Sequence, residues 1–280
     1  MAIDPNLRIG SVRLAVGDLQ RSTDFYEQVL GLPVIARSEG EARLGADGET
    51  SLLLSPIAEA TRAPAHSTGL FHVAWLHPSR AALADTVRRI VQAGWRIDGA
   101  SDHGVSEALY LSDPDGLGIE IYADRPREQW ARPPGGKGVE MVTLALDIDD
   151  LLAQASESLS PQITPGTAVG HVHMKVSDVQ RANEFYRDTL GFEEEAMLPS
   201  AAFLAAGGYH HHVGLNSWQS QGSARAPDSA PGLREVRFRL SDAAAIEALE
   251  RQAASTSSLV RDGEQLSVRD PNGQLLTFSS

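Results

Sequence analysis

Residues 10–31 read GSVRLAVGDLQRSTDFYEQVLG, and residues 170–191 read GHVHMKVSDVQRANEFYRDTLG. The two stretches align without a gap, and the identical positions include Asp18 with Asp178, Phe25 with Phe185, Tyr26 with Tyr186 and Leu30 with Leu190. Self-similarity of this kind indicates that one structural unit has been duplicated along the chain. The fold is therefore best approached as a set of repeated modules.

Each copy predicts a strand followed by an amphipathic helix and further strands. In the first copy Asp18 fits the N-cap, and apolar residues then recur at helical spacing at Leu19, Phe25, Tyr26, Val29 and Leu30. Gly31 and Gly191 fit the position just after a helix, where a left-handed conformation is needed. The strand-like segments that follow are 33–36 and 51–54 in the first copy, and 203–204 and 211–215 in the second.

A second kind of unit follows each copy. Residues 69–75 (GLFHVAW) lead into a predicted helix at 79–93, and residues 232–238 (GLREVRF) lead into one at 242–253. Both units close with turn chemistry, Asp-Pro-Asp-Gly and Asp-Pro-Asn-Gly, before a last strand. These turns occupy 113–116 and 270–273, and the last strands 119–122 and 275–278.

The chain therefore predicts four βαβββ-like modules, near residues 9–57, 69–124, 168–218 and 231–280. Residues 125–138 are rich in Pro, Gly and Arg and indicate a connector, and the amphipathic stretch 144–155 predicts a bridging helix. We expect modules one and two within residues 1–124, a linker with the helix at 125–167, and modules three and four at 168–280.

Composition narrows the classes of function. The chain of 280 residues carries a formal net charge of −13, which argues against nucleic acid and against an anionic membrane surface as partners. It has no cysteine, so thiolate metal sites and disulfides are excluded, whereas nine histidines supply nitrogen donors. No apolar run has the length of a signal peptide or a membrane span, and we expect a cytoplasmic protein.

The repeat pattern resembles the vicinal oxygen chelate superfamily, which includes glyoxalase I, bleomycin-resistance proteins and extradiol dioxygenases. The resemblance extends over nearly the whole chain. It implies an α+β fold in which the four βαβββ modules pair into two cup-shaped half-barrel domains. In that superfamily the curled strands of a cup surround a metal or another ligand.

The superfamily's metal ligands lie on the first strand of a module and on a last strand, and the modules of this chain differ there. The first-strand positions hold Ser11, His72, His171 and Glu235, and the last-strand positions hold Glu120 and Thr277. His72, Glu120 and His171 match a 2-His-1-carboxylate set, which leaves positions on Fe(II) open for substrate and O2. The remaining Ser11, Glu235 and Thr277 make no metal site.

The distribution of these residues favours a crossed pairing of modules. Pairing by sequence order would give one half two ligands and the other half one. Pairing the second module with the third, and the first with the fourth, gathers the whole set in one cup. A domain-swapped dimer would also complete it.

Residues 103–120 (HGVSEALYLSDPDGLGIE) resemble the extradiol dioxygenase signature. The resemblance implies that Glu120 is the iron ligand and that His103 and Tyr110 lie over the substrate, with Tyr110 hydrogen-bonded to the catechol oxygen or to the peroxo intermediate. Ser101 is a small departure from the usual pattern. Residues 124–130 (DRPREQW) look like the compact catechol-2,3-dioxygenase branch, in which the ring opens beside the two hydroxyls.

Residues 209–216 (YHHHVGLN) match the family segment in which a histidine lies beside bound O2. Local register selects His211, and strand alternation predicts that His210 and His212 point away from it. A polar surface tract or adventitious metal binding is the alternative. His173 follows His171 by two positions and shares its strand face, where it either lines the pocket or packs as an ordinary core histidine.

Extradiol cleavage of a catechol with O2 is thus the predicted activity, with Fe(II) as cofactor and Mn(II) as the alternative. Histidine suits the proton transfers near neutral pH, which we assign to His211 on the O2 side and His103 on the substrate side. The partners expected are a small-molecule catechol and O2, with no nucleic acid and no membrane, and a homo-oligomer stays open. Two rivals are a glyoxalase-like metal-dependent lyase or isomerase and a metal-free bleomycin-resistance-type binding protein. A third, an epimerase or fosfomycin-type transferase, leaves residues 103–110 unexplained.

Overall fold

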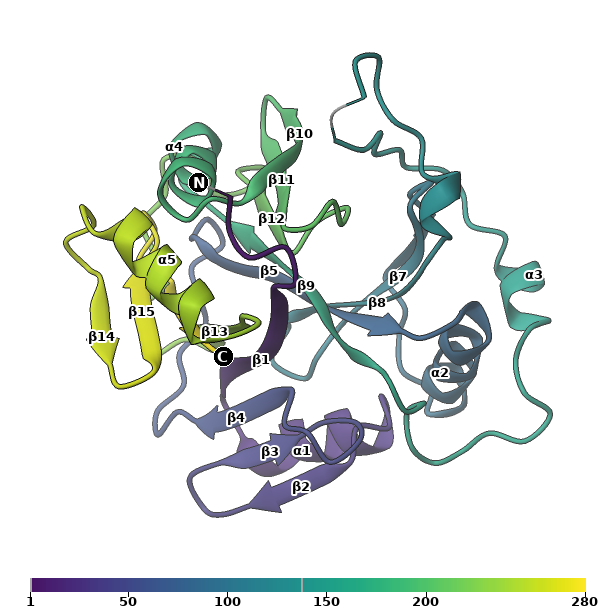
Figure 1. Ribbon diagram of the computed structural model, residues 1–280. Helices are drawn as coiled ribbons and strands as arrows, with labels where there is room; N and C mark the ends of the chain where they lie inside the picture. The colour runs from purple at the N-terminus through teal and green to yellow at the C-terminus, as the bar shows by residue number, and fades with distance from the viewer. Residues whose placement is uncertain (1, 137) are drawn as a thin grey trace.

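The computed structural model describes residues 2–136 and 138–280, so Met1 and, within the predicted connector, Lys137 lie outside the described residues. Each predicted module contains one helical segment and four strands (Figure 1). Module one comprises β1 (Arg8–Val16), α1 (Leu19–Gln28), β2 (Val34–Arg37), β3 (Ala42–Leu44) and β4 (Leu52–Pro56). Module two comprises β5 (Gly69–His77), α2 (Arg80–Gln92), β6 (Gly99–Asp102), β7 (Ser106–Ser112) and β8 (Gly118–Asp124).

The second half of the chain repeats this order after a connector. The connector holds a 3₁₀ turn, η1 (Arg127–Gln129), and a short helix, α3 (Ile148–Leu152). Module three comprises β9 (Ala168–Lys175), α4 (Val179–Glu184), a π-helical turn η2 (Phe185–Thr189), β10 (Glu193–Leu198), β11 (Ala201–Ala205) and β12 (Val213–Asn216). Module four comprises β13 (Gly232–Arg239), α5 (Ala243–Ala253), β14 (Val260–Asp262), β15 (Gln265–Arg269) and β16 (Leu275–Ser279).

The crossed pairing of modules is confirmed. One eight-stranded sheet has the order β14-β15-β16-β13-β1-β4-β3-β2, and the other has the order β10-β11-β12-β9-β5-β8-β7-β6. The first joins modules one and four and is called cup 1–4, and the second joins modules two and three and is called cup 2–3. Figure 1 shows β1 beside β13 and β5 beside β9, the two antiparallel pairs at the centres of the cups.

The four main helices begin where the sequence predicts. The side chains of Asp18, Ser79, Asp178 and Asp242 accept hydrogen bonds from backbone N–H groups of the first helical turn. These bonds satisfy donors that a helix N-terminus otherwise leaves unpaired. Gly31 and Gly191 have φ values of 81° and 86°, which confirms the left-handed position after each duplicated helix.

Two predicted elements differ from the structure. The bridging helix expected at 144–155 is reduced to α3, because Asp147 caps it and the chain leaves the helix after Leu152. The strand expected at 211–215 begins only at Val213, so residues 210–212 form a loop. This second difference changes where three histidine side chains point.

A single apolar core joins the cups. Val12 and Val236 of cup 1–4 and Val73 and Val172 of cup 2–3 belong to one continuous buried cluster. Successive residues of a strand face opposite sides, so the neighbours of Val73 and Val172 face away from this cluster. Within the described residues, no helix is long and apolar enough to cross a membrane.

Candidate active site

Three adjacent strands of cup 2–3 bring the predicted ligands together. Ala74 of β5 pairs with Glu120 of β8 on one side and with His171 of β9 on the other. His72 lies two positions before Ala74 and therefore shares its face. The crossed pairing of β5 with β9 is what places the residue from module three beside the two from module two.

The three side chains converge at one buried point. One ligand atom of each of His72, Glu120 and His171 lies within 4.8 Å of the others, and all three residues are buried. Glu120 Oε2 lies 2.9 Å from His72 Nε2 and 3.2 Å from His171 Nε2. A single chain therefore assembles the set without a domain-swapped partner.

The charges of this cluster suit a cation. Burial lowers the pKa of His171 to about 4, so its imidazole is neutral near pH 7 and has a free lone pair. Burial raises the pKa of Glu120, but interactions with His171 and His72 outweigh this and place that pKa well below its usual value. Neutral imidazoles and an ionised carboxylate are the forms that bind metal ions.

Unsatisfied atoms point to the same conclusion. His72 Nε2 is buried and makes no hydrogen bond, although it lies 2.9 Å from Glu120 Oε2, and His171 Nδ1 is buried with no hydrogen-bond partner among the described residues. A buried polar group without a partner is costly, and coordination of a metal ion would remove part of that cost. Two nitrogen donors and one oxygen donor match a 2-His-1-carboxylate centre, so the residues present fit a divalent metal such as Fe(II).

His103 and Tyr110 form a hydrogen-bonded pair at the edge of the cluster. His103 Nε2 lies 2.7 Å from the hydroxyl of Tyr110, and Nδ1 lies 2.7 Å from the carbonyl oxygen of Val142. Since a carbonyl only accepts, Nδ1 carries the proton and Nε2 accepts from Tyr110 in the neutral ring. Tyr110 pairs with Glu120 across β7 and β8, and its ring lies 5.7 Å from that of His72.

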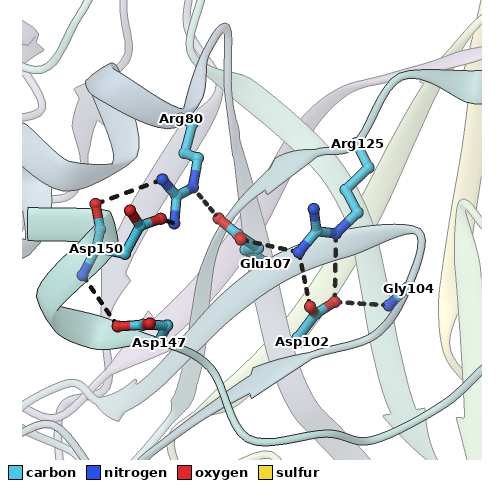
Figure 2. A network of polar contacts seen from close by, with 7 residues as sticks. All are labelled: Arg80, Asp102, Gly104, Glu107, Arg125, Asp147 and Asp150. Carbon is cyan, nitrogen blue, oxygen red and sulfur yellow. Dashed lines mark hydrogen bonds and ion pairs between the residues drawn. The ribbon is translucent and has the colours of Figure 1, made fainter. Parts of the chain in front are cut away.

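An ion-pair network holds the turn that carries His103 (Figure 2). Arg125 Nη2 lies 2.6 Å from Asp102 Oδ2 and 2.9 Å from Glu107 Oε1. Asp102 in turn accepts from the backbone N–H of Gly104 at 2.9 Å, and Arg80 of α2 reaches Glu107 at 2.5 Å. The network ties β6, β7, α2 and the end of β8 together, and fixes the residues on either side of His103. No sequence motif indicated it.

The histidine tract lies inside the molecule. His210, His211 and His212 are all buried, so the surface-tract alternative is wrong. The expectation that His210 points away from His211 is also wrong, since their Nδ1 atoms lie 2.8 Å apart. The reason is that residues 210–212 form a loop, where strand alternation does not apply. The ring of His211 lies 4.0 Å from that of His171, whereas His210 Nε2 binds Asp124 at 2.9 Å.

His173 lies beside the centre, in an aromatic setting that the sequence did not reveal. Its ring lies 5.0 Å from His72, 5.1 Å from Phe71 and 5.6 Å from Trp218. Burial lowers the pKa of His173 well below its usual value, and its Nε2 has no partner among the described residues. Trp218 remains 54% exposed and so lies at the rim of this group. Phe71 and Trp218 gave no signal in the sequence, because an aromatic residue in a strand or loop most often belongs to the core.

A cavity of about 780 Å³ reaches this group of residues. Its lining includes His72, Phe71 and Tyr110 from cup 2–3, and Leu233 and Gln274 from cup 1–4. Such a volume accommodates a small aromatic molecule. The cavity therefore gives access to the His72 side of the cluster from the junction of the two cups.

In each half of the chain, a tyrosine of one module binds the Asp-Pro-x-Gly turn of the next module. The hydroxyl of Tyr26 donates to Asp113 Oδ2 at 3.3 Å, and that of Tyr186 donates to Asp270 Oδ2 at 3.3 Å. This part of the extradiol-like signature therefore has a structural function, because it recurs in module four, where the last-strand carboxylate is replaced by Thr277.

The equivalent point of cup 1–4 has no metal-binding chemistry. Glu235 Oε1 accepts from the hydroxyl of Thr277 at 2.7 Å and lies 2.9 Å from Arg237 Nε, while Oε2 lies 3.7 Å from Arg13 Nε. Two guanidinium groups thus lie near this carboxylate, whereas two imidazoles lie near the carboxylate of Glu120 in cup 2–3. Among the described residues, His72, Glu120 and His171 form the one group of three or more histidine and carboxylate side chains that could hold a metal ion.

Comparison with known proteins agrees with this architecture. The model of the Glyoxalase/Bleomycin resistance protein/Dioxygenase superfamily matches residues 8–121 and 168–278, and the chain belongs to this superfamily. The catechol-2,3-dioxygenase of Bacillus subtilis (strain 168) is 39% identical over 283 residues, which cover 99% of each chain. The lactoylglutathione lyase of Escherichia coli O157:H7 is 28% identical over 127 residues, 42% of this chain and 94% of that protein.

The fold also recurs among solved structures. A crystal structure from Bacillus subtilis subsp. subtilis str. 168 superimposes with a TM-score of 0.68 at 15% sequence identity, covering 99% of this chain and 86% of that chain. At such low identity the likeness concerns the fold, which is the two-cup arrangement described above.

Proposed function

We propose that this protein is an extradiol dioxygenase that opens a catechol with O2 at an Fe(II) held by His72, Glu120 and His171. The convergence of these three buried side chains within 4.8 Å is the observation that carries the proposal. The full-length relative named catechol-2,3-dioxygenase supports a catechol as the substrate and O2 as the second reactant.

The donor set suits Fe(II), and Mn(II) is the alternative that the same ligands would accept. When bound, the metal would supply a centre at which a catechol and O2 meet and through which electron density passes between them. His72, Glu120 and His171 would hold that metal on one face of the cup. The remaining steps are binding, orientation and proton transfer, for which this chain offers residues on both sides of the cluster.

On the substrate side, Tyr110 and His103 form a route for a proton. A catechol oxygen near Tyr110 would pass its proton to the tyrosine hydroxyl as that hydroxyl gives its own to His103 Nε2. His103 Nδ1 keeps its proton on the carbonyl oxygen of Val142 throughout, at 2.7 Å. Histidine is suited to hold the transferred proton near neutral pH.

His211 supports acid–base chemistry on the other side of the cluster. Its ring lies against His171, at 4.0 Å, whereas the ring of Tyr110 lies against His72 at 5.7 Å. The two candidate groups thus flank different ligands, which supports assigning His211 to the O2 side and His103 to the substrate side. His173, with Phe71 and Trp218 around it, would limit the access of water to the bound ring.

Metal content and O2 uptake, measured on the same preparation, test the proposal. Protein loaded anaerobically with Fe(II) should consume one O2 per catechol and release a yellow ring-opened product, and removal of the metal with a chelator should abolish both. Glu120→Gln, which keeps the size of the side chain but removes its charge, should lower iron content and O2 uptake together. Bound metal without O2 uptake on any catechol would replace the proposal with a lyase or isomerase, and a failure to bind metal would leave a binding protein.

A further inference from the structure

We propose that the catechol taken by this protein carries a carboxylate substituent, and that Lys175 binds it. The inference deepens the proposed function and rests on it for the catechol part of the ligand. It starts from a lysine on the same strand and the same face as His171 and His173.

Strand alternation places Lys175 on the site face of β9. Val172 and Met174 belong to the apolar core, so His171, His173 and Lys175 face the opposite side. Lys175 lines the cavity of about 780 Å³ that also reaches His72 and Tyr110. At about 3.3 Å per residue, the Cα atoms of His171 and Lys175 lie roughly 13 Å apart along the strand. A lysine side chain pointing back along the cavity would therefore meet the far side of a ring whose two oxygens face the His171 cluster.

The charge of Lys175 has no internal counterpart in the described part of the chain. Burial lowers the pKa of Lys175, and no carboxylate contributes to the shift. Most other cations near the cavity have partners, such as Arg225, which lies 3.0 Å from Asp228 Oδ1, and Arg234, which donates to two carbonyl oxygens. A half-buried ammonium group without a carboxylate partner favours an anionic ligand.

The cavity as a whole is cationic in an acidic protein. Its charged lining residues are Arg62, Lys175, Arg225 and Arg234 on the positive side, and Asp98 and Asp115 on the negative side. Both aspartates form ion pairs with arginines outside the lining, Asp98 with Arg96 and Asp115 with Arg21, and Arg225 is likewise paired with Asp228. Arg62, Lys175 and Arg234 are left without an ion-pair partner among the described residues. Because the chain carries a net charge of −13, this local excess of positive charge runs against the overall balance and attracts anions.

Binding of matched catechols to the anaerobic Fe(II)-loaded protein tests the inference. The pairs are 3,4-dihydroxybenzoate with 4-methylcatechol, and 3,4-dihydroxyphenylacetate with 4-ethylcatechol, which differ mainly in charge. We expect the wild-type protein to bind at least one carboxylated member about tenfold more tightly than its neutral match, as a charge-assisted hydrogen bond allows. Lys175→Gln should abolish that ratio, and Lys175→Arg should retain most of it.

A charge reversal gives a second measurement. Lys175→Glu should shift the preference toward 3,4-dihydroxyphenethylamine, whose substituent is cationic. Equal affinities for the charged and neutral members in the wild-type protein would overturn the inference, as would an unchanged ratio in a folded Lys175→Gln variant. O2 uptake with the same ligands is scored separately. Carboxylate-selective binding without O2 uptake would support the carboxylate site at Lys175 and contradict the proposed dioxygenase activity. O2 uptake without such selectivity would support the activity and contradict the carboxylate site.

Discussion

Cup 2–3 and cup 1–4 have the same strand order and differ in what their central strands carry. In cup 2–3, β9, β5 and β8 present His171, His72 and Glu120, whereas β1, β13 and β16 of cup 1–4 present Ser11, Glu235 and Thr277. In cup 2–3 the carboxylate of Glu120 lies against two imidazoles, whereas in cup 1–4 the carboxylate of Glu235 accepts from Thr277 and lies 2.9 Å from Arg237 Nε. The same strand arrangement carries both sets of residues, so the capacity to hold a metal depends on a few side chains and not on the strand arrangement.

The arginine pair explains why the second cup is closed to a metal. Arg13 occupies the position equivalent to His173, and Arg237 the position equivalent to Ala74, which pairs with Glu120 on one side and His171 on the other. Guanidinium groups remain charged at all ordinary pH values and repel a cation. Cup 1–4 thus has a closed ion-pair site and contributes residues to the cavity that leads to the other cup.

The largest expected effect comes from comparing alanine substitutions at two equivalent positions, His171 of cup 2–3 and Ser11 of cup 1–4. His171→Ala removes one of the three proposed ligands, so iron content should fall to near zero and O2 uptake by about a thousandfold. Ser11→Ala should leave both as in the wild-type protein. Iron content is measured by metal analysis and O2 uptake with an oxygen electrode. A His171→Ala variant that keeps its full iron content and activity would show that the metal centre does not include His171.

A pH effect follows from a residue that only cup 2–3 has. His77, which corresponds to Leu240 of cup 1–4, is buried with Nε2 at 3.0 Å from Thr86 Oγ1, and burial lowers its pKa to about 4. The unfolded chain therefore binds a proton that the native one does not between about pH 6.5 and pH 4, so stability falls as pH falls through this window.

His77→Leu introduces the residue that cup 1–4 has at the equivalent position. It should remove the part of the pH dependence of stability that comes from protonation of His77. In urea unfolding of the metal-free protein, the loss of stability between pH 7 and pH 5 should shrink by about 2 kcal/mol relative to wild type. His171 and His212, whose pKa values burial lowers to about 4 and about 3, will keep part of the pH dependence. An identical loss in variant and wild type would refute the role of His77.

Tyr110 and its equivalent in cup 1–4 allow the proposed proton transfer to be tested separately from metal binding. The equivalent position of cup 1–4 is Ser267, which pairs with Thr277 as Tyr110 pairs with Glu120. Tyr110→Phe should lower kcat by about tenfold to a hundredfold while iron content stays constant, because in the proposed mechanism the hydroxyl would transfer a proton and would not hold the metal. Ser267→Ala is the matched control and should change neither. A loss of iron in Tyr110→Phe would mean that the residue positions the ligands instead.

The sequence predicted the modules, their crossed pairing and the residues that converge, because duplication makes positions comparable and a missing ligand is visible beside its copies. It failed for the loop at 210–212, since a short apolar-polar run does not show where a strand begins. It also missed Phe71, Trp218 and the Arg125 network. Their positions depend on contacts between segments distant in sequence, such as Arg80 of α2 with Glu107 of β7 at 2.5 Å.

The smallest expected effect tests whether the two halves of the chain use their turns alike. Tyr26→Phe and Tyr186→Phe each remove one hydrogen bond, to Asp113 and Asp270 respectively, and each should lower the free energy of unfolding by about 1 kcal/mol. The carboxylates keep their bonds from backbone N–H groups, so neither variant should unfold.

Activity should distinguish the two tyrosine variants even though their stability does not. The Asp113 turn leads into β8 and Glu120, whereas the Asp270 turn leads into β16 and Thr277. Loss of the bond to Asp113 would therefore disturb β8, the strand that carries Glu120. We expect a fewfold fall in O2 uptake for Tyr26→Phe and none for Tyr186→Phe. Equal losses of activity in both variants would show that the two cups are mechanically coupled through their shared core, and that the chemistry of cup 2–3 depends on the rigidity of cup 1–4.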